Sequence, residues 1–160
     1  MMNINLIVMG RLKEEWLRAA CAEYEKRLGA FCKIKVTVLE PEKLPENAGD
    51  AMIEDALIAE GDRILSKIPA SCFVAALCIE GKELSSEELA QTLEKIAVGG
   101  NSEIAFVIGS SFGLSERVKR IANIRLSMSR MTFPHQLARV MLLEQLYRAF
   151  SINSNRKYHK

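Results

Sequence analysis

Two turn-forming segments in the second half of the chain have the composition of ligand-binding loops. The first, Gly109-Ser110-Ser111-Phe112-Gly113, follows the apolar run Phe106-Val107-Ile108 and precedes a helical pattern. Ligands of open parallel sheets bind outside the carboxyl ends of the strands, where glycine lets the backbone approach them closely. The segment is neither a Walker loop, which needs Gly-Lys-Ser/Thr, nor a GxGxxG fingerprint. It is compatible with a ligand site, but an ordinary strand-to-helix turn explains it as well.

The second segment, residues 128–135, mixes apolar side chains with hydroxyl groups, and Pro134 lies close to the start of the last helical pattern. Such a loop can line an apolar pocket while its backbone groups hydrogen-bond a ligand. A connector whose Met and Phe side chains fill the core is the alternative. His135 fits either a base or a packing residue at the helix start. We favour the packing role, because the loop has no acidic residue beside the ring.

The C-terminal segment, residues 153–160, is polar and basic and contains Tyr158 and His159. Basic side chains hold phosphates and an aromatic ring stacks on a base, although a frayed terminus has the same composition. The net charge of +2 divides into −6 for residues 1–115 and +8 for residues 116–160. This asymmetry indicates a polyanionic partner, while a solvated basic surface without a partner is the alternative.

The 160 residues, 49% of them hydrophobic, are sufficient for one domain spanning residues 1–160 with its own core. No apolar run approaches the roughly 20 residues that span a bilayer. The first residues are typical of a strand rather than a signal peptide, so we expect a cytoplasmic protein without membrane association. Cys21, Cys32, Cys72 and Cys78 lack the spacing of a zinc or redox motif, so we expect neither a metal nor a disulfide.

Short β-rich runs alternate along the chain with longer helical patterns. This alternation predicts an α/β fold with a mainly parallel sheet flanked by helices. The pattern does not reveal the order of the strands in the sheet. We expect strands at residues 3–9, 34–40, 72–79, 104–108 and 124–127, and helices at 16–28, 53–65, 85–96, after Ser115 and at 136–150. Ser85 and Glu88 have the spacing of a capping box.

Several motifs occur in an order and at spacings that resemble one family over essentially the whole chain. They are residues 10–13, 22–28, 81–87, 106–109, 126–129, 131–136, 144–149 and 158–160. The chain resembles the small SPOUT-class methyltransferases that methylate N3 of a pseudouridine in 23S ribosomal RNA of the large subunit. The resemblance implies S-adenosyl-L-methionine as cofactor, a trefoil knot near the C-terminus, and a homodimer. The last helix, with Leu143, Leu146, Tyr147 and Phe150, is a candidate interface, and packing on its own sheet is its alternative role.

The resemblance also implies roles for individual residues. The expected cofactor contacts are Leu77, Gly109, Met128, Ser129, Arg130, Met131, Thr132 and Phe133. Tyr158, His159 and Lys160 occupy positions linked in the family to substrate recognition and catalysis. We expect His159 to be the general base, and we expect Arg130, Arg139, Arg156 and Lys157 to contact RNA.

Two positions depart from the family pattern. Ser110 stands where the family usually has a second glycine, which adds a side chain beside the expected adenosyl pocket. Arg156-Lys157 precede the Tyr-His pair where the family has a proline or a small residue. Three other functions stay open: an RNA-binding ribosome assembly factor without catalysis, which Ser110 favours; a SPOUT methyltransferase for transfer RNA; and a flavodoxin-like nucleotide or phosphate binder, which does not explain the basic tail.

Overall fold

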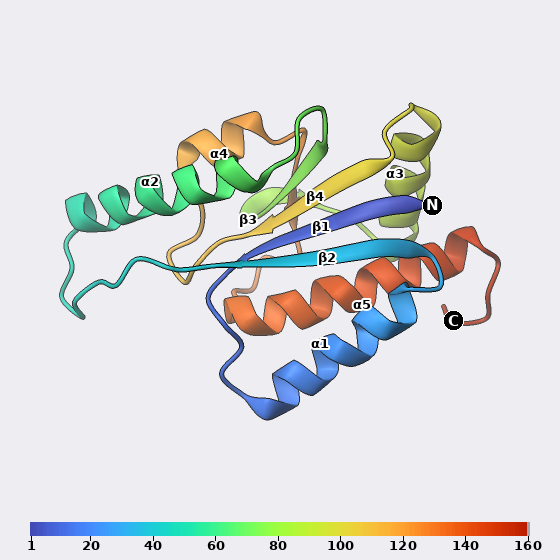
Figure 1. Cartoon of the computed structure of the whole chain (residues 1–160), viewed down its shortest axis with the longest axis horizontal. Coiled ribbons are helices and arrows are strands. Elements are labelled where there is room, and N and C mark those ends of the chain that lie inside the picture. Colours follow the sequence, from blue (N-terminus) through green and yellow to red (C-terminus); the bar gives the residue numbers. More distant parts are fainter. Residues whose placement is uncertain (160) are drawn as a thin grey trace.

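Five parallel strands form one sheet, and helices cover both of its faces (Figure 1). The structure is a computed structural model that describes residues 1–159, so Lys160 lies outside the described residues. In chain order the elements are β1 (Met2–Met9), α1 (Glu15–Leu28), β2 (Cys32–Leu39), α2 (Asp50–Lys67), β3 (Phe73–Glu83), α3 (Ser86–Val98), β4 (Glu103–Ile108), α4 (Glu116–Ile121), β5 (Ile124–Ser127) and α5 (His135–Asn153).

The strands lie in the order β2-β1-β4-β3-β5, and every neighbouring pair is parallel. The expected mainly parallel sheet is therefore confirmed, and the sheet is parallel throughout. β4 lies between β1 and β3, and it is buried along its whole length except for Glu103. A strand covered on both faces has this continuously apolar sequence.

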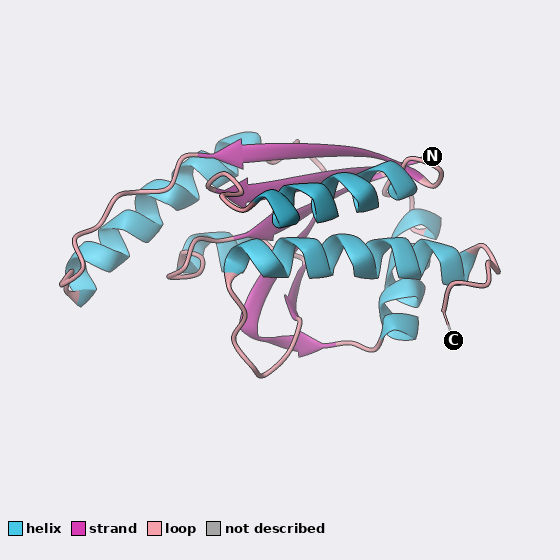
Figure 2. Ribbon diagram, turned by 90° about the horizontal axis from the view of Figure 1, so that it is seen from below, coloured by secondary structure: helices cyan, strands magenta, loops and turns pink. Residues whose placement is uncertain are grey.

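The helices divide into two groups, because successive residues of a strand point to opposite faces of a sheet. α1, α3 and α5 pack on one face with Leu6 and Phe106, while α2 and α4 pack on the other with Ile7 and Val107. Figure 2 shows α1 and α5 running side by side across their face. Among residues 1–159, no helix is long and apolar enough to cross a membrane.

The predicted boundaries hold for most elements, and the structure corrects two expectations. The capping box is confirmed, since Ser85 Oγ accepts from the Glu88 amide at 3.1 Å and Glu88 Oε2 accepts from the Ser85 amide at 2.7 Å. Leu143 and Leu146 are fully buried in the core of their own subunit, so they do not form a contact with a second copy. Their alternative role, packing on their own sheet, is the correct one.

The second correction concerns β3, which continues to Glu83 rather than ending at residue 79. Leu77 and Lys82 both pair with Leu126 of β5, so β3 bends between them around its neighbour. Gly81 makes this close approach possible: a Cβ atom there would lie 2.8 Å from the backbone carbonyl of Arg125. Ile79 and Glu80 are exposed, so the apolar pattern of a buried strand does not continue into residues 80–83 and the sequence does not reveal the last part of β3.

Replacing Gly81 with alanine tests this packing. The added methyl group must displace the Arg125 backbone, so we expect Gly81→Ala to lower the free energy of unfolding by about 1–3 kcal/mol. Denaturant unfolding of the purified protein measures the change. Gly49→Ala, whose Cβ meets nothing within 4 Å, is the control and should lower the free energy of unfolding by less than Gly81→Ala does. Equal losses in the two variants would show that the contact with Arg125 is not tight.

Candidate functional site

The two turn-forming segments meet at the carboxyl edge of the sheet, where they line one cavity of about 660 Å³. One wall comes from the end of β3, a second from the glycine turn after β4, and a third from the segment between β5 and α5. Crevices outside the carboxyl ends of strands are the usual ligand sites of such sheets. The cavity volume lies in the range of small-molecule sites.

The glycine turn is tightly closed on itself. The Gly113 amide donates to the Ser110 carbonyl oxygen at 2.9 Å, and Gly113 has a positive φ of 91° that favours glycine. A Cβ atom on Gly109 would lie 2.1 Å from the carbonyl oxygen of Gly113, so only glycine fits at position 109. The Ser110 hydroxyl donates to Glu60 Oε1 at 2.8 Å. All five residues of the turn line the cavity, so the turn offers it both backbone groups and the exposed side chains of Ser111 and Phe112.

The segment after β5 is held by two serine hydroxyl groups. Ser127 Oγ donates to the carbonyl oxygen of Ser129 at 3.0 Å, and Ser129 Oγ accepts from the Met131 amide at 3.0 Å. This local bonding turns Arg130 outward: its side chain is 92% exposed and lies 3.9 Å from Glu83 Oε1. The apolar side chain of Phe133 lines the cavity.

The structure brings together all but one of the residues expected to contact a cofactor. Those that line the cavity are Leu77, Gly109, Met128, Ser129, Met131, Thr132 and Phe133. Arg130 is the exception, because its side chain points to solvent. A cofactor contact by Arg130 stays a prediction, and its exposed side chain leaves the backbone as the part that can make it.

Glu80 and Lys119 form an ion pair at the rim of this cavity, which sequence reasoning missed. Lys119 Nζ lies 2.5 Å from Glu80 Oε1, and this hydrogen bond holds the pKa of the Glu80 carboxyl below its ordinary value. Glu80 follows the buried part of β3 and Lys119 belongs to α4. Because the two residues are far apart in the sequence, no local pattern predicts that they form an ion pair.

His135 starts α5 and lines the same cavity. Burial lowers the pKa of its imidazole from 6.5, and the positive charge of Lys13 adds to this effect. The ring is therefore neutral at pH 7. This environment agrees with the packing role expected for His135, since no hydrogen bond to its ring occurs among residues 1–159.

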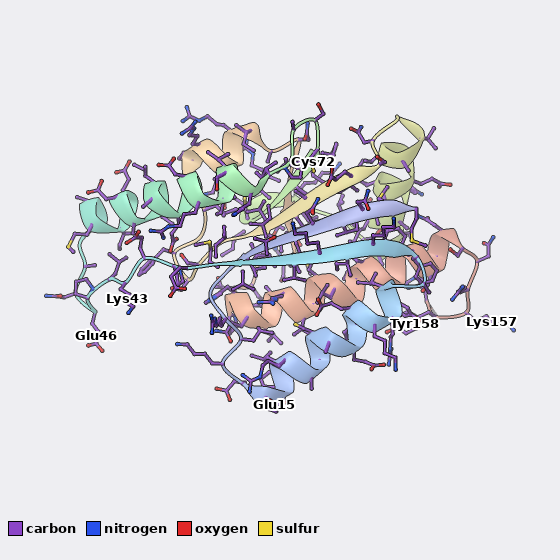
Figure 3. The ribbon with its side chains drawn as sticks, viewed as in Figure 1. Glu15, Lys43, Glu46, Cys72, Lys157 and Tyr158 are labelled. Carbon is purple, nitrogen blue, oxygen red and sulfur yellow. The ribbon has the colours of Figure 1, made fainter. Side chains whose placement is uncertain are left out.

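The C-terminal segment lies away from the cavity, at the end of the molecule where α1 and α5 also end (Figure 3). Tyr158 donates from its hydroxyl to Glu144 Oε1 at 3.2 Å, and its ring packs edge-on against Tyr147 with 4.7 Å between the centroids. Arg148 binds the same Glu144 oxygen at 2.7 Å. The tail is thus anchored to α5 rather than frayed.

His159 is held between two charged groups. Its Nδ1 lies 3.2 Å from an Arg148 guanidinium nitrogen, and its Nε2 lies 2.7 Å from Glu87 Oε1. Arg148 can only donate, so Nδ1 accepts and Nε2 carries the proton donated to Glu87. Burial, with hydrogen bonding to Tyr24 and the charge of Glu144, raises the pKa of Tyr158 to about 12. Tyr158 is therefore a neutral hydrogen-bond donor at physiological pH.

A second recess of about 470 Å³ lies on the other side of the segment that ends β5. Leu126, Ser127 and Met128 line both the recess and the cavity. Glu144, which binds Tyr158 and Arg148, borders the recess. The thin wall of residues 126–128 therefore separates the cavity from the neighbourhood of the tail. Glu144 and Arg148 belong to the motif at residues 144–149, but no role could be assigned to them from the sequence, because an i,i+4 pair is ordinary on a helix.

The basic residues expected to contact RNA occupy different environments. Arg156 and Lys157 are exposed, and the Arg156 guanidinium lies 4.6 Å from the centroid of the Phe31 ring. Arg139 is only 8% exposed, and its Nε has no hydrogen-bond partner among residues 1–159. Arg139 is therefore not part of the exposed basic surface.

Cys21, Cys32 and Cys78 are buried in the core, and Cys72 is partly buried. Burial raises the pKa values of Cys32 and Cys72 to about 11, so both thiols are protonated at pH 7. Within the described part of the chain, no three His, Cys, Asp or Glu side chains gather in a way that could hold a metal ion.

A parallel sheet with a ligand-sized cavity between the turns after β4 and β5 defines the class of protein, an α/β domain with its site at the carboxyl edge of the sheet. The chain belongs to the SPOUT methyltransferases, because the family model described as predicted SPOUT methyltransferase matches residues 2–159. The resemblance of the motifs to this family is thereby confirmed.

Among curated proteins, the chain is 50% identical to "Ribosomal RNA large subunit methyltransferase H" of Clostridioides difficile over 159 residues, which cover 99% of this chain and 100% of the relative. The protein of the same name from Bacillus pumilus is 52% identical over the same length, with the same coverage. The match extends over the cavity and the tail alike.

Solved structures share the fold at low sequence identity. A probable methyltransferase from Bordetella pertussis has a TM-score of 0.56 at 13% identity, covering 93% of this chain and 96% of that one. A probable methylase family protein from Haemophilus influenzae has a TM-score of 0.54 at 17% identity, covering 99% of this chain and 70% of that one.

The low pKa of His135 predicts a dependence of stability on pH. As the pH falls, His135 takes up a proton in the unfolded chain near the ordinary pKa of 6.5, before it does so in the folded protein. The contribution of the neutral ring to the free energy of unfolding is therefore present above that pH and is lost as the pH falls below it. We expect His135→Gln to lose less thermal stability between pH 7.5 and pH 5.5 than the unaltered protein. Melting temperatures at both pH values measure this, and an equal loss would contradict the assignment.

Proposed function

We propose that this chain transfers a methyl group from S-adenosylmethionine to N3 of a pseudouridine in 23S ribosomal RNA. The observation that carries the proposal is the shared cavity, in which the turns after β4 and β5 face one space. Relatives named as ribosomal RNA large subunit methyltransferases match the chain at 50% identity over nearly its full length, which supports the substrate class.

The residues around the cavity fit S-adenosylmethionine. Leu77, Met131 and Phe133 offer apolar surface to a flat adenine, and the backbone groups of the two turns offer hydrogen bonds. Gly109 lines the cavity, and only glycine fits there because a Cβ atom would meet the carbonyl oxygen of Gly113. Met128, Ser129 and Thr132 complete the proposed contacts, and Arg130 would contribute through its backbone.

S-adenosylmethionine, when bound, supplies a methyl group attached to a sulfonium, and the leaving group is a neutral thioether. The residues of the chain must hold the nucleotide in line with that methyl group and accept the N3 proton. The wall of residues 126–128 separates the cavity from the recess near Glu144. A nucleobase of the RNA that enters from the side of the recess therefore approaches the cavity across this wall.

His159 is the proposed general base, and Tyr158 and Lys160 complete the proposed catalytic tail. In the described conformation the lone pair of His159 Nδ1 faces Arg148, so proton uptake requires that this contact opens. Tyr158 remains protonated and serves as a donor that orients the substrate. A cation, Arg130 or Lys160, would stabilise the negative charge that develops on the pseudouridine.

The RNA surface of the proposal consists of the exposed cations Arg130, Arg156 and Lys157. Exposed Lys and Arg side chains hold phosphates, which position an RNA without reading its sequence. Arg139 is left out of this surface because it is buried. The substrate is the RNA of the large subunit or of the assembled ribosome, which places the enzyme in the cytoplasm.

We propose a homodimer with α5 at the interface. Leu137, Val140 and Met141 of α5 are apolar residues that are only half-buried. Neighbouring apolar side chains that remain partly exposed are a candidate contact surface for a second copy. The Arg139 Nε, which lacks a partner among residues 1–159, would then find an acceptor on the second copy.

We further propose that the C-terminal part of the chain is threaded as a trefoil knot. The path of the chain around β5 supports this threading. β5 pairs at the edge of the sheet, and the following helix, α5, packs between α1 and α3. Mechanical stretching from both termini tests the threading, because a knotted chain stops short of the contour length of 160 residues. Extension to the full length would refute the knot.

Two measurements test the function. Calorimetric titration with S-adenosylmethionine should show saturable binding, whereas an RNA-binding assembly factor without catalysis needs no cofactor. Mass spectrometry of ribosomal RNA nucleosides should then show that one methylated pseudouridine disappears when the gene is deleted and returns on complementation. Loss of a methylated nucleoside from transfer RNA instead would assign the chain to the alternative substrate.

Replacement of His159 tests the proposed base. His159→Ala should lower kcat by about 100-fold, the lower range for general base catalysis, and leave the Kd for S-adenosylmethionine nearly unchanged. His159→Gln is the matched control, because it can still donate to Glu87 but cannot take up a proton at neutral pH. If His159→Gln restores turnover, or if kcat and Kd change equally in His159→Ala, the base role is wrong.

A further inference from the structure

Glu60 is a buried carboxylate on α2, only 4% exposed, and it contacts the glycine turn from outside the cavity. Glu60 Oε1 accepts from the Ser110 hydroxyl at 2.8 Å, and Oε2 accepts from the Glu42 amide at 3.0 Å. No cation within residues 1–159 forms an ion pair with this carboxylate. Its stability in the interior therefore depends on these two hydrogen bonds.

The next residue of α2 holds the other end of the same turn. Gly61 packs so closely that a Cβ atom there would lie 2.5 Å from Ser115 Oγ. Ser115 in turn caps α4 by accepting from the Val118 amide at 3.3 Å. Two successive residues of α2 thus contact both ends of the segment that runs from Ser110 to Ser115.

α2 is itself tied to the end of β2. Arg63 donates to the Glu40 carbonyl oxygen at 2.8 Å and forms an ion pair with the Glu42 carboxylate. Glu60 therefore connects a fixed segment after β2 to the glycine turn. The connection is specific to a side chain with a hydroxyl group at position 110, since a glycine there offers no such donor.

We propose that Glu60 is a positioning residue for the cofactor turn and that it acts through Ser110. The inference rests on the proposed function in one respect, that the turn binds S-adenosylmethionine. Ser110 is then no obstacle to the cofactor: its hydroxyl faces Glu60, and the bond fixes the backbone of Gly109 and Gly113 in the shape that the ligand meets. Removal of either partner leaves the other unsatisfied and loosens the turn.

Hydrogen exchange and calorimetry on a small set of variants test this. We compare Glu60→Ala, Ser110→Ala and the double variant with Glu60→Gln, whose amide can accept from Glu42 and donate to Ser110 Oγ. Asp55→Ala, at an exposed position of α2, is the control. In the ligand-free protein, we expect amides 110–114 to exchange about 10-fold faster in both alanine variants and to be unchanged in Glu60→Gln and Asp55→Ala.

The Kd for S-adenosylmethionine should rise about 10-fold in either single alanine variant, with no further rise in the double variant and a largely unchanged kcat at saturation. A merely structural role would lower the melting temperature and the binding stoichiometry and leave the Kd of the folded fraction unchanged. That result would overturn the proposal. Unchanged exchange of the turn amides in the alanine variants, or additive effects on the Kd in the double variant, would overturn it as well. Ser110→Ala keeps the test valid if Glu60→Ala does not fold.

The exchange measurement also separates this proposal from the proposed function. If the unaltered protein does not bind S-adenosylmethionine, the cofactor assignment fails. The exchange of amides 110–114 still decides whether Glu60 holds the turn.

Discussion

The close packing of β3 around Leu126 is the constraint on which the site depends. Leu77 and Lys82 both pair with this residue, and the absence of a side chain at Gly81 lets the two backbones meet. β5 is thereby fixed at the edge of the sheet, and the segment that follows it must turn back over the carboxyl ends of β3 and β4. The cavity exists because this return path faces the glycine turn.

The same edge divides the molecule into two chemical environments. On the cavity side, apolar side chains surround backbone groups and the neutral ring of His135, and the Glu80–Lys119 ion pair lies at the rim. On the other side, Glu144, Arg148 and the C-terminal residues form a network of charged and hydrogen-bonded groups. An environment of the first kind suits an apolar ligand with a few fixed polar contacts, and one of the second kind suits proton transfer and anion binding.

Much of the architecture could be predicted from the sequence, because it depends on local patterns. The apolar run of β4 and the capping box at Ser85 are properties of a few adjacent residues, and both predictions are confirmed. Both loops of the cavity were found because turn residues follow strands. The outward direction of Arg130 and the burial of Arg139 could not be predicted, since they depend on which element lies opposite. The burial of Glu60 could not be predicted either, because a single glutamate on an amphipathic helix is normally exposed.

The contacts that hold the tail could not be predicted from the motifs. Tyr158 and His159 were given roles, whereas their partners Glu144, Arg148 and Glu87, which lie in other motifs of the chain, were not. These contacts join residues that are 11 to 72 positions apart in the chain. Pairing at such a distance is fixed by the crossing of α3 and α5, which no local pattern encodes.

The strand order has a consequence for how the chain acquires its structure while it is being synthesised. Within residues 1–159, β3 pairs only with β4 and β5, and both are made after it. β1 and β2 find each other early, but the edge of β1 that later meets β4 stays open until residue 108 has left the ribosomal exit tunnel. The nascent protein therefore carries apolar strands without partners through most of its translation, and its sheet cannot close until β5 has also emerged, near the end of elongation.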